Sequence, residues 1–255
     1  TITNYEYSSD NGSTWRAFSP ATTSTPLEIT VRSDAGEAGT QISIGNEYSC
    51  ALTQDGTVAC WGRNEHGQLG DGTTTNRSVP VAVTGGALAG KTVTHVATSA
   101  WHSCALTQDG NVACWGGNDY GQLGDGTTTN SSVPVAVTGG ALAGKTITHI
   151  AVGYFQSCAL TSDGVVVCWG RNDYGQLGDG ITTNRSVPVA VTGGALAGKT
   201  ITRIAIGAWH SCALTQDGTV ACWGYNGYGQ LGDGTTSSSS VPIAVTAGVL
   251  AGKTI

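Results

Sequence analysis

The chain has 255 residues, of which 39% are apolar and only 11% are charged, and its formal net charge is −6 at pH 7. This composition excludes a disordered polyelectrolyte. The eleven basic residues are scattered, which excludes the concentrated positive surface that nucleic acids require, so we expect no nucleic-acid partner. No apolar run approaches the roughly 20 residues of a membrane-spanning helix, and we expect no membrane insertion.

Residue usage indicates the fold class and the compartment. Thirty-nine glycines, with many Thr, Ser and Val residues, favour short strands and tight turns, so we predict an all-β protein. Eight cysteines and no methionine favour an oxidising environment, and we expect an extracellular or cell-surface location. The chain begins at Thr1 without a leader sequence, which we interpret as a mature, trimmed or excised chain. Asn-X-Ser sequons fit an exposed extracellular surface, although three of them are copies made by the repeat described below: Asn11, Asn76, Asn130 and Asn184.

Residues 1–39 differ from the rest of the chain. The stretch YEYSSDNGSTWRAF at 5–18 predicts a β-hairpin that turns at SDNGS. This segment resembles part of a bacterial fibronectin type III domain, which implies a partial β-sandwich. Because a truncated sandwich exposes unpaired strand edges, we expect these strands to pair with the first repeat or with another chain.

From residue 40 to residue 255 the sequence repeats itself four times. Cys50, Cys104, Cys158 and Cys212 follow one another at intervals of 54 residues, and so do Trp61, Trp115, Trp169 and Trp223. The units are therefore 40–93, 94–147, 148–201 and 202–255. In β sequence, a period of about 50 predicts propeller blades or solenoid rungs, which cannot bury their own faces without neighbours.

Each unit predicts four strands. In the second unit we expect strands at 94–99, 102–107, 111–116 and 133–138. The segment 116–132 is rich in Gly, Asn, Asp and Ser and predicts a loop, and the segment 139–146 links one unit to the next. Four-stranded units in series are typical of propeller blades.

The sequence CALTQDGTVACWGRNEHGQLGDGT at 50–73, and the motif WGxNxxGQLGDG in all four units, closely resemble the repeat of the regulator of chromosome condensation family. This resemblance implies blades that usually close a ring of seven, so we expect an arc or a ring completed by further repeats or by another copy. The founding member exchanges nucleotide on a small GTPase and binds chromatin through an insertion that these uniform units lack. A secreted bacterial relative inhibits β-lactamases through aromatic residues on one rim.

The paired cysteines predict cross-strand disulfides. If QDG at 54–56 is a three-residue hairpin loop with Gly56 in the left-handed conformation, Thr53 faces Thr57 and Cys50 faces Cys60 in a closely spaced, non-hydrogen-bonded pair. Two alternatives are buried free thiols and a zinc site, but ten-residue spacing and the lack of a recurrent His disfavour zinc, and we predict no metal and no cofactor. The predicted disulfides are Cys50–Cys60, Cys104–Cys114, Cys158–Cys168 and Cys212–Cys222.

Other polar residues do not predict catalysis. The recurrent carboxylates Asp71, Asp125, Asp179 and Asp233 stand alone in each unit, so we interpret them as caps of their own turns rather than as calcium ligands. His102 and His210 correspond to Tyr48 and Gln156, which cannot replace an imidazole. We find no catalytic constellation and predict that the protein is not an enzyme.

The turn before each SCAL strand carries bulky side chains that differ between units, and a second variable position follows the recurrent tryptophan. Trp and Tyr clustered with charged neighbours are typical of protein-binding hot spots. The second variable position lies either on the same face of the blades as the turn or on the opposite face. As an alternative to partner binding, Trp101, Phe155 and Trp209 pack between adjacent blades. We expect the Trp61 set to form inter-blade core. The predicted partner-binding residues are Glu47, Tyr48, Trp101, His102, Tyr154, Phe155, Trp209, His210, Arg63, Arg171 and Tyr225.

Three functions fit these observations. The leading one is a non-enzymatic extracellular interaction or structural module of a larger bacterial surface or secreted protein, which assembles head to tail with further copies of itself because its units are nearly identical. The second is a secreted propeller that binds or inhibits one protein target through an aromatic rim. The third is a glycan-binding propeller.

Overall fold

The computed structural model describes residues 6–7, 16–17 and 40–246 and divides the chain into two units, Thr1–Thr30 and Val31–Ile255. In the first unit, β1 (Glu6–Tyr7) and β2 (Arg16–Ala17) form the antiparallel pair expected of a hairpin. The expected pairing of these strands with the first repeat or with another chain stays a prediction. The turn and the remaining fibronectin-like segment within 1–39 lie outside the described residues.

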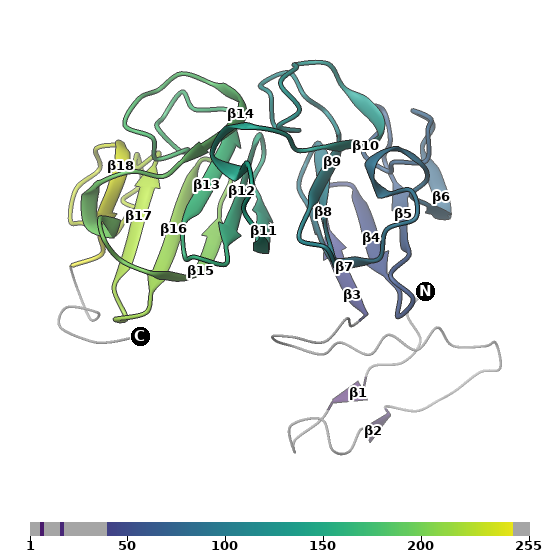
Figure 1. Cartoon of the computed structure of the whole chain (residues 1–255), viewed down its shortest axis with the longest axis horizontal. Helices are drawn as coiled ribbons and strands as arrows, with labels where there is room; N and C mark the ends of the chain where they lie inside the picture. Colours follow the sequence, from purple (N-terminus) through teal and green to yellow (C-terminus); the bar gives the residue numbers. More distant parts are fainter. Residues whose placement is uncertain (1–5, 8–15, 18–39, 247–255) are drawn as a thin grey trace. The chain divides into compact units, whose positions relative to one another are not determined.

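The second unit contains four separate four-stranded antiparallel sheets, one for each repeat, which confirms the all-β, blade-type fold (Figure 1). Blade 1 consists of β3 (Gln41–Ile44), β4 (Tyr48–Leu52), β5 (Val58–Gly62) and β6 (Arg77–Ala82). Blade 2 consists of β7 (Val93–Thr98), β8 (His102–Thr107), β9 (Val112–Gly116) and β10 (Ser131–Ala136). Blade 3 consists of β11 (Ile147–Val152), β12 (Gln156–Thr161), β13 (Val166–Gly170) and β14 (Arg185–Ala190). Blade 4 consists of β15 (Ile201–Ile206), β16 (His210–Thr215), β17 (Val220–Gly224) and β18 (Ser239–Ala244).

The blades follow one another in chain order along an arc (Figure 1). The first strands β3, β7, β11 and β15 contact one another along its inner side, and the last strands lie outside. The links between blades contain short 3-10 helices that the sequence did not predict: η1 (Gly86–Leu88), η2 (Gly140–Leu142) and η3 (Gly194–Leu196). In the described part of the chain no helix has the length and apolar character needed to cross a membrane.

The hairpin between the second and third strands has the predicted register. Gly56 has a φ of 79°, the backbone N–H of Thr53 donates to the carbonyl of Thr57 at 2.9 Å, and Cys50 lies opposite Cys60. The Cα atoms of this cysteine pair are 4.1 Å apart, slightly closer than the about 4.5 Å typical of a non-hydrogen-bonded pair. The structure forms all four predicted disulfides and leaves no described cysteine free: Cys50–Cys60, Cys104–Cys114, Cys158–Cys168 and Cys212–Cys222.

The loop after the third strand is a compact, hydrogen-bonded structure. In blade 1 the buried Asn64 side chain accepts from the backbone N–H of Leu69 at 2.9 Å and donates to the carbonyls of Thr73 and Thr75, each at 3.1 Å. The Asp71 carboxylate accepts the backbone N–H of Thr73 at 3.0 Å, which is the turn-capping role that the sequence predicts. The loop therefore has a fixed shape although it contains no strand or helix.

A tryptophan joins each blade to the one before it. The indole N–H groups of Trp115, Trp169 and Trp223 donate to the backbone carbonyls of Gln68, Gln122 and Gln176, each at 2.9 Å. These three tryptophans are fully buried, as expected of an inter-blade core. Trp61 is only half-buried, because no described blade precedes it.

Glycine lets this tryptophan approach the backbone closely. Gly70 has a φ of 69°, and a Cβ atom at this position would lie 2.8 Å from the Trp115 indole nitrogen. A side chain at Gly70 would therefore both strain the backbone and displace the indole.

We expect each disulfide to stabilise the arc through its small loop. Replacing Cys158 and Cys168 together with Ser should lower the free energy of unfolding by about 2–3 kcal/mol, because the unfolded chain regains the entropy of a short closed loop. Denaturant unfolding monitored by tryptophan fluorescence measures this change. The control is the mass of the intact protein, which should rise by about one dalton per thiol on reduction, and a mass that does not change would contradict all four bridges.

Candidate functional site

Two variable segments meet at one edge of every blade. The backbone N–H of the residue after each recurrent Trp-Gly donates to a carbonyl in the turn before the second strand, at 2.8–2.9 Å: Arg63 to Glu47, Gly117 to Trp101, Arg171 to Phe155 and Tyr225 to Trp209. The two variable sets therefore lie on the same edge, which decides the alternative that the sequence left open. We call the ring-bearing and arginine side chains of this edge the aromatic rim: Arg63, His66, Trp101, Tyr120, Tyr154, Phe155, Arg171, Tyr174, Trp209, Tyr225 and Tyr228.

The rings of the rim contact one another from blade to blade. Trp101 and Phe155 are stacked, with centroids 6.1 Å apart and an interplanar angle of 10°. Tyr174 of blade 3 contacts both Trp209 at 5.4 Å and Tyr225 at 4.9 Å in blade 4. The alternative that these aromatics pack between blades is thus realised, and it leaves part of each ring at the surface.

Arg171 lies at the centre of the rim. Its guanidinium carbon is 4.7 Å from the Tyr120 ring centroid, 5.6 Å from that of Phe155 and 4.5 Å from that of Trp209, so one cation contacts three blades. Its Nε also donates to Asp173 at 2.6 Å. Such cation–π contacts hold the rings at fixed positions while the guanidinium remains partly hydrated.

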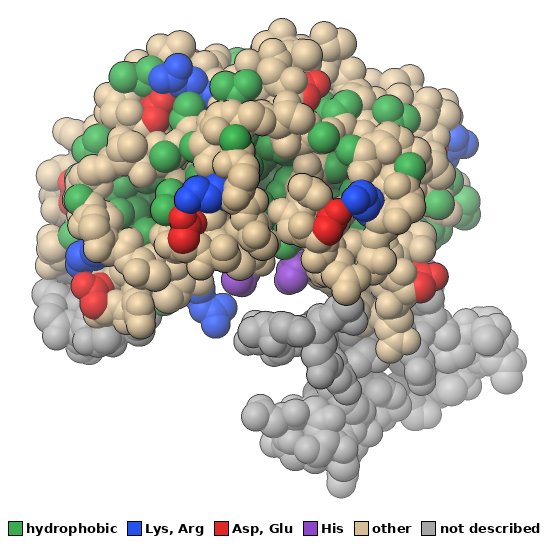
Figure 2. Space-filling model, in the orientation of Figure 1, with side chains coloured by type: hydrophobic (Ala, Val, Ile, Leu, Met, Phe, Trp, Pro, Cys, Tyr) green, Lys and Arg blue, Asp and Glu red, His purple; other side chains and the backbone are tan. Residues whose placement is uncertain are grey.

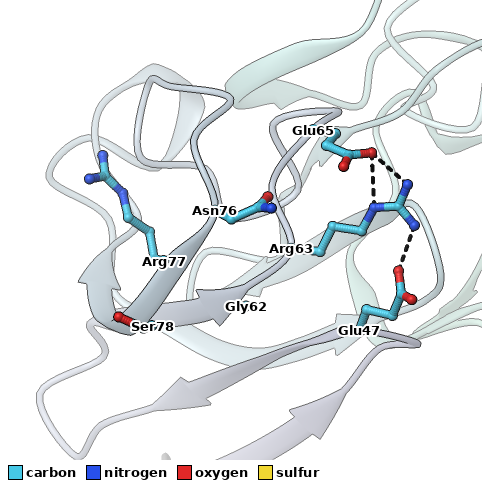
Figure 3. A pocket seen from close by; sticks show the side chains of 7 residues that line it. All are labelled: Glu47, Gly62, Arg63, Glu65, Asn76, Arg77 and Ser78. Atoms are coloured by element: carbon cyan, nitrogen blue, oxygen red, sulfur yellow. Dashed lines mark hydrogen bonds and ion pairs between the residues drawn. The ribbon is translucent and has the colours of Figure 1, made fainter.

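Arg63 has the corresponding position in blade 1. Its guanidinium carbon lies 5.2 Å from the Trp101 ring centroid, and its nitrogens contact the carboxylates of Glu47 and Glu65, each at 2.5 Å. Beside it the structure has an open, shallow pocket (Figure 3). The pocket is lined by Glu47, Gly62, Arg63, Glu65, Asn76, Arg77 and Ser78.

The rim combines partly buried anchors with exposed rings. Trp101, Phe155, Arg171, Trp209 and Tyr225 are half-buried. Tyr154, Tyr174 and Tyr228 are 42%, 37% and 89% exposed. Figure 2 shows one face of the molecule, on which green apolar side chains are scattered among tan groups and charged side chains are few. The combination of half-buried and exposed rings on the rim suits an amphipathic partner.

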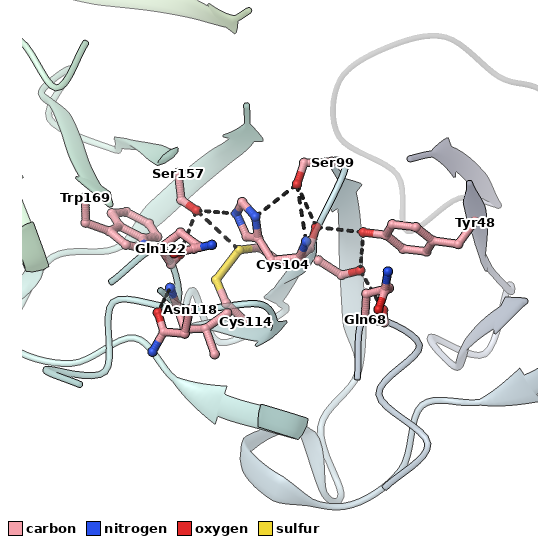
Figure 4. The surroundings of a disulfide bond; sticks show 12 residues. Tyr48, Gln68, Ser99, Cys104, Cys114, Asn118, Gln122, Ser157 and Trp169 are labelled. Atoms are coloured by element: carbon pink, nitrogen blue, oxygen red, sulfur yellow. Dashed lines mark hydrogen bonds between the residues drawn. A yellow bond between two sulfur atoms is a disulfide. The ribbon is translucent and has the colours of Figure 1, made fainter. Parts of the chain in front are cut away.

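Two predicted partner-binding residues lie in the interior, and this part of the prediction is wrong. Tyr48 is 3% exposed and His102 is fully buried, because each begins the second strand of its blade and its side chain points into the joint with the next blade. The Tyr48 hydroxyl donates to the His102 carbonyl at 2.7 Å and is paired with Ser103 Oγ at 2.9 Å. His102 Nε2 is paired with Ser157 Oγ at 2.8 Å (Figure 4).

Burial changes the acidity of both groups. Desolvation raises the pKa of the Tyr48 phenol well above its usual range, although the hydrogen bond to Ser103 opposes this effect. Desolvation also lowers the pKa of the His102 imidazole to about 3. Because Ser157 Oγ donates its own hydrogen to the Gln122 carbonyl at 2.9 Å, it accepts from His102 Nε2, and the imidazole is a neutral donor in this joint.

Serines and glutamines that were not predicted from the sequence also form these joints. The hydroxyl groups of Ser103, Ser157 and Ser211 donate to the carbonyls of Gln68, Gln122 and Gln176, the same three oxygens that accept the tryptophan N–H groups. Gln156 reaches the Gly207 carbonyl of the next blade at 3.0 Å. The signal that could have found the serines and the acceptor glutamines is their identity in all four units, whereas Gln156 occupies a position that varies.

The other predicted contact residues reach the surface. Glu47, Tyr154, Trp101, Phe155, Trp209, Arg63, Arg171 and Tyr225 lie on the rim edge with full or partial exposure. His210 is half-buried, unlike its counterpart His102. Their role in partner binding stays a prediction. In the described ranges no group of three or more His, Cys, Asp or Glu side chains has an arrangement that could hold a metal ion.

Comparison with known proteins identifies the family. A family model described as the RCC1-like domain matches residues 8–255. The chain belongs to the RCC1-like domain family. The match takes in residues 8–39, and the resemblance of that segment to a fibronectin type III domain stays a prediction.

The chain is similar to segments of larger curated proteins. This RCC1-like chain is 38% identical to the human E3 ubiquitin-protein ligase HERC2 over 206 residues, which is 80% of this chain and 4% of HERC2. It is 36% identical to the Arabidopsis thaliana ultraviolet-B receptor UVR8 over 205 residues, which is 80% of this chain and 45% of UVR8. The chain therefore spans less than half the length of these relatives.

Solved structures share the fold. Human WBSCR16 is 29% identical, with a TM-score of 0.73 over 85% of this chain and 55% of that one. Yeast RCC1, solved with Kap60, is 22% identical, with a TM-score of 0.70 over 84% of this chain and 50% of that one. These matches confirm the propeller-type blade architecture, in which the described residues of this RCC1-like chain form four blades.

The buried imidazole makes stability depend on pH. The pKa of His102 is depressed in the folded state, so its neutral form contributes stability above the unfolded-state value of about 6.5, and this stability is lost as pH falls toward 3. Between pH 7 and about pH 4.5 the wild type should lose about 2–3 kcal/mol more than His102→Gln, which copies the residue of blade 3. Urea unfolding at the two pH values measures the difference, and equal losses would contradict a buried neutral imidazole.

The guanidinium of Arg171 should contribute more to the free energy of unfolding than an exposed cation does. Arg171→Ala removes three ring contacts and should lower the free energy of unfolding by about 1–2 kcal/mol. Lys145→Ala is the matched control, because Lys145 forms one exposed ion pair with Asp163 and should change stability by less than about 0.5 kcal/mol. Thermal and urea unfolding measure both variants, and equal effects would show that the ring contacts add nothing.

Proposed function

We propose that this chain is a non-enzymatic protein-interaction module that binds a protein partner through the aromatic rim. The observation that carries this proposal is the unbroken series of ring and guanidinium contacts across all four blades, in which Tyr154, Tyr174 and Tyr228 remain exposed. Half-buried rings held by their neighbours lose little entropy on binding, which is the property of interface hot spots.

The charge distribution of the rim favours a partner whose surface has both apolar and polar side chains. Arg63 and Arg171 are each paired with acidic side chains of their own blade, so the edge has no strong net field. A partner with apolar side chains surrounded by polar groups of both signs would fit this pattern better than a strongly charged one. The net charge of −6 adds to this argument, because it disfavours polyanions.

We place the module outside the cell, in a secreted or surface protein of bacterial origin. Four disulfides, each inside one buried hairpin, support an oxidising compartment. Assembly with further copies of the same chain is the second candidate function, and the contacts that recur in all three joints between described blades favour it.

Exposed rim tyrosines give the most direct test. Tyr154→Ser and Tyr174→Ser together should weaken binding of an extracellular partner at least tenfold, since they remove exposed rings without opening the core. Ile181→Ser is the matched control, because Ile181 is 41% exposed on the loop after β13 and takes no part in the ring contacts. The measurement is the affinity of a partner purified on the wild-type chain from the envelope and secreted proteins of the source cell.

The same variants distinguish the remaining candidates. Unchanged affinity in the double variant would overturn the rim as the binding surface. Binding to a glycan array that the double variant loses and the Ile181 variant keeps would replace the protein partner with a sugar, because exposed tyrosines also stack on sugar rings.

A further inference from the structure

Two histidines that do not belong to the aromatic rim lie together on the inner side of the arc. His95 is on β7 and His149 is on β11, the first strands of blades 2 and 3, and these strands contact each other (Figure 1). Their ring centroids are 6.3 Å apart, and the ring planes are tilted by 45°. Described blades flank blades 2 and 3 on either side, so the surroundings of this pair do not depend on where the chain begins or ends.

The pair arises from the register of the repeat. His95 and His149 have equivalent positions in the pairing of the first strand with the second. The same register position carries Gln41 in blade 1 and Arg203 in blade 4. Successive inner strands therefore carry four polar residues at one level, and the two in the middle are imidazoles. None of the four is a carboxylate, so the row lacks the ligands that Ca²⁺ and Mg²⁺ prefer.

A threonine fixes the tautomer of His95. The Thr94 hydroxyl donates to the carbonyl of Leu106 at 3.2 Å, and a carbonyl can only accept. The same hydroxyl oxygen lies 3.2 Å from His95 Nδ1, so it accepts the Nδ1 proton of the ring. The Nε2 atom of the neutral imidazole then carries a lone pair, and it has no hydrogen-bond partner among the described residues.

His149 is held in the same way. The Thr148 hydroxyl donates to the carbonyl of Leu160 at 3.1 Å and lies 3.1 Å from His149 Nδ1. In blade 4 the corresponding Thr202 also donates to a carbonyl, that of Leu214, at 3.1 Å, although an arginine follows it. The backbone of the blade, and not the imidazole, therefore sets the direction of this hydroxyl. Both histidines of the pair consequently present a free Nε2 lone pair.

The charges around the pair act in two directions. Desolvation lowers the pKa of His95, and repulsion by His149 adds to this effect, so the ring is neutral at pH 7. Arg203 lies on β15, the strand next to β11, and its positive charge opposes the binding of a cation. The Arg203 side chain is exposed, so water and salt screen this repulsion.

The geometry of the two rings fits one metal ion. An imidazole whose Nδ1–H is bound to an oxygen and whose Nε2 is free is the form in which histidine ligates metals. Two imidazoles on one ion have ring centroids about 5–6 Å apart, because each metal–nitrogen bond is about 2.0–2.1 Å long. His149 is exposed and His95 is half-buried, so a small rotation of either side chain closes the difference from 6.3 Å.

We propose that His95 and His149 together bind one divalent transition-metal ion through their Nε2 atoms, with water in the remaining coordination positions. Imidazole ligands suit Zn²⁺, Ni²⁺ and Cu²⁺, and Cu²⁺ binds such ligands most tightly. No described cysteine is free, so no thiolate among the described residues competes for the ion. The sequence-based prediction of no metal rested on the cysteine spacing and on the lack of a histidine in every unit, whereas this pair needs two units only.

A bound ion would connect blades 2 and 3. It would join β7 to β11 at the inner side of the arc, where the described residues form no disulfide between blades. Because both ligands come together only in the folded chain, the ion should stabilise the folded state. This role goes beyond the proposed function and does not depend on what the aromatic rim binds.

The repeat itself supplies conservative variants. His95→Gln copies the residue of blade 1 at this register position, and His149→Arg copies that of blade 4. Arg203→Gln removes the neighbouring cation and leaves the pair intact. His210→Gln is the matched control, because it removes a histidine outside the pair and copies Gln156, its counterpart in blade 3.

Calorimetric titration of the 255-residue chain with Cu²⁺ is the test. The wild type and His210→Gln should bind one Cu²⁺ with both imidazoles as ligands, whereas His95→Gln and His149→Arg should each weaken binding at least tenfold. Arg203→Gln should tighten binding about twofold or more, because a repelling charge is lost. Electron paramagnetic resonance should detect two coordinated imidazole nitrogens in the wild type and one in each single variant.

Urea unfolding provides a second measurement. Cu²⁺ should raise the unfolding midpoint of the wild type and of His210→Gln and leave that of His95→Gln and His149→Arg unchanged. Without metal all four chains should unfold cooperatively, which shows that the substitutions do not prevent folding.

Three results would overturn the proposal. They are a wild type that does not bind one Cu²⁺ per chain, an affinity that survives either substitution in the pair, and a spectrum of the wild type with a single imidazole nitrogen. The rim assay is independent of these outcomes, because binding of a partner through Tyr154 and Tyr174 is measured without Cu²⁺. Failure of the metal site would therefore leave the interaction module standing.

Discussion

The bond from a tryptophan indole to a glutamine carbonyl one blade earlier is the interaction on which the rest of the structure depends. It connects Trp115, Trp169 and Trp223 to backbone atoms of the preceding blade at 2.9 Å. A single four-stranded sheet buries little of its own surface, and stacking on a neighbour supplies the missing core. The acceptor carbonyls belong to the loop after the third strand, so that loop must be rigid, and the buried Asn64 and its equivalents make it so.

The rim exists because of the same arrangement. Stacking brings the variable turn of one blade against the variable loop of its neighbours, which is how Arg171 comes to face rings from three blades. The scaffold residues are constant and the rim residues change, so the binding edge can vary in sequence without disturbing the joints. A repeat scaffold can therefore change its binding surface without changing the residues that hold its blades together.

Much of this architecture could be predicted from the sequence, and the reasons are physical. The period of 54 residues, the turn chemistry of Asp55-Gly56 and the opposed Cys50 and Cys60 are local features, and the strands, the register and the disulfides followed from them. The orientation of Tyr48 and His102 could not be predicted, because it depends on which neighbour encloses the first residue of a strand. Trp61 differs from its three counterparts for the same reason. The burial of a side chain at a joint depends on the neighbouring blade as well as on its own, so identical residues at equivalent positions of different blades have different environments.

Every disulfide is contained within a single hairpin, ten residues apart in sequence, and none connects two blades. A gene duplication that adds one unit therefore adds one self-sufficient cystine, which can form as soon as its own hairpin does. Oxidative pairing favours the same partners however many units are added, since the two cysteines of a hairpin are ten residues apart while the next unit's first cysteine, such as Cys104 after Cys60, lies 44 residues farther along the chain. This containment allows the array to lengthen or shorten during evolution without creating orphaned thiols.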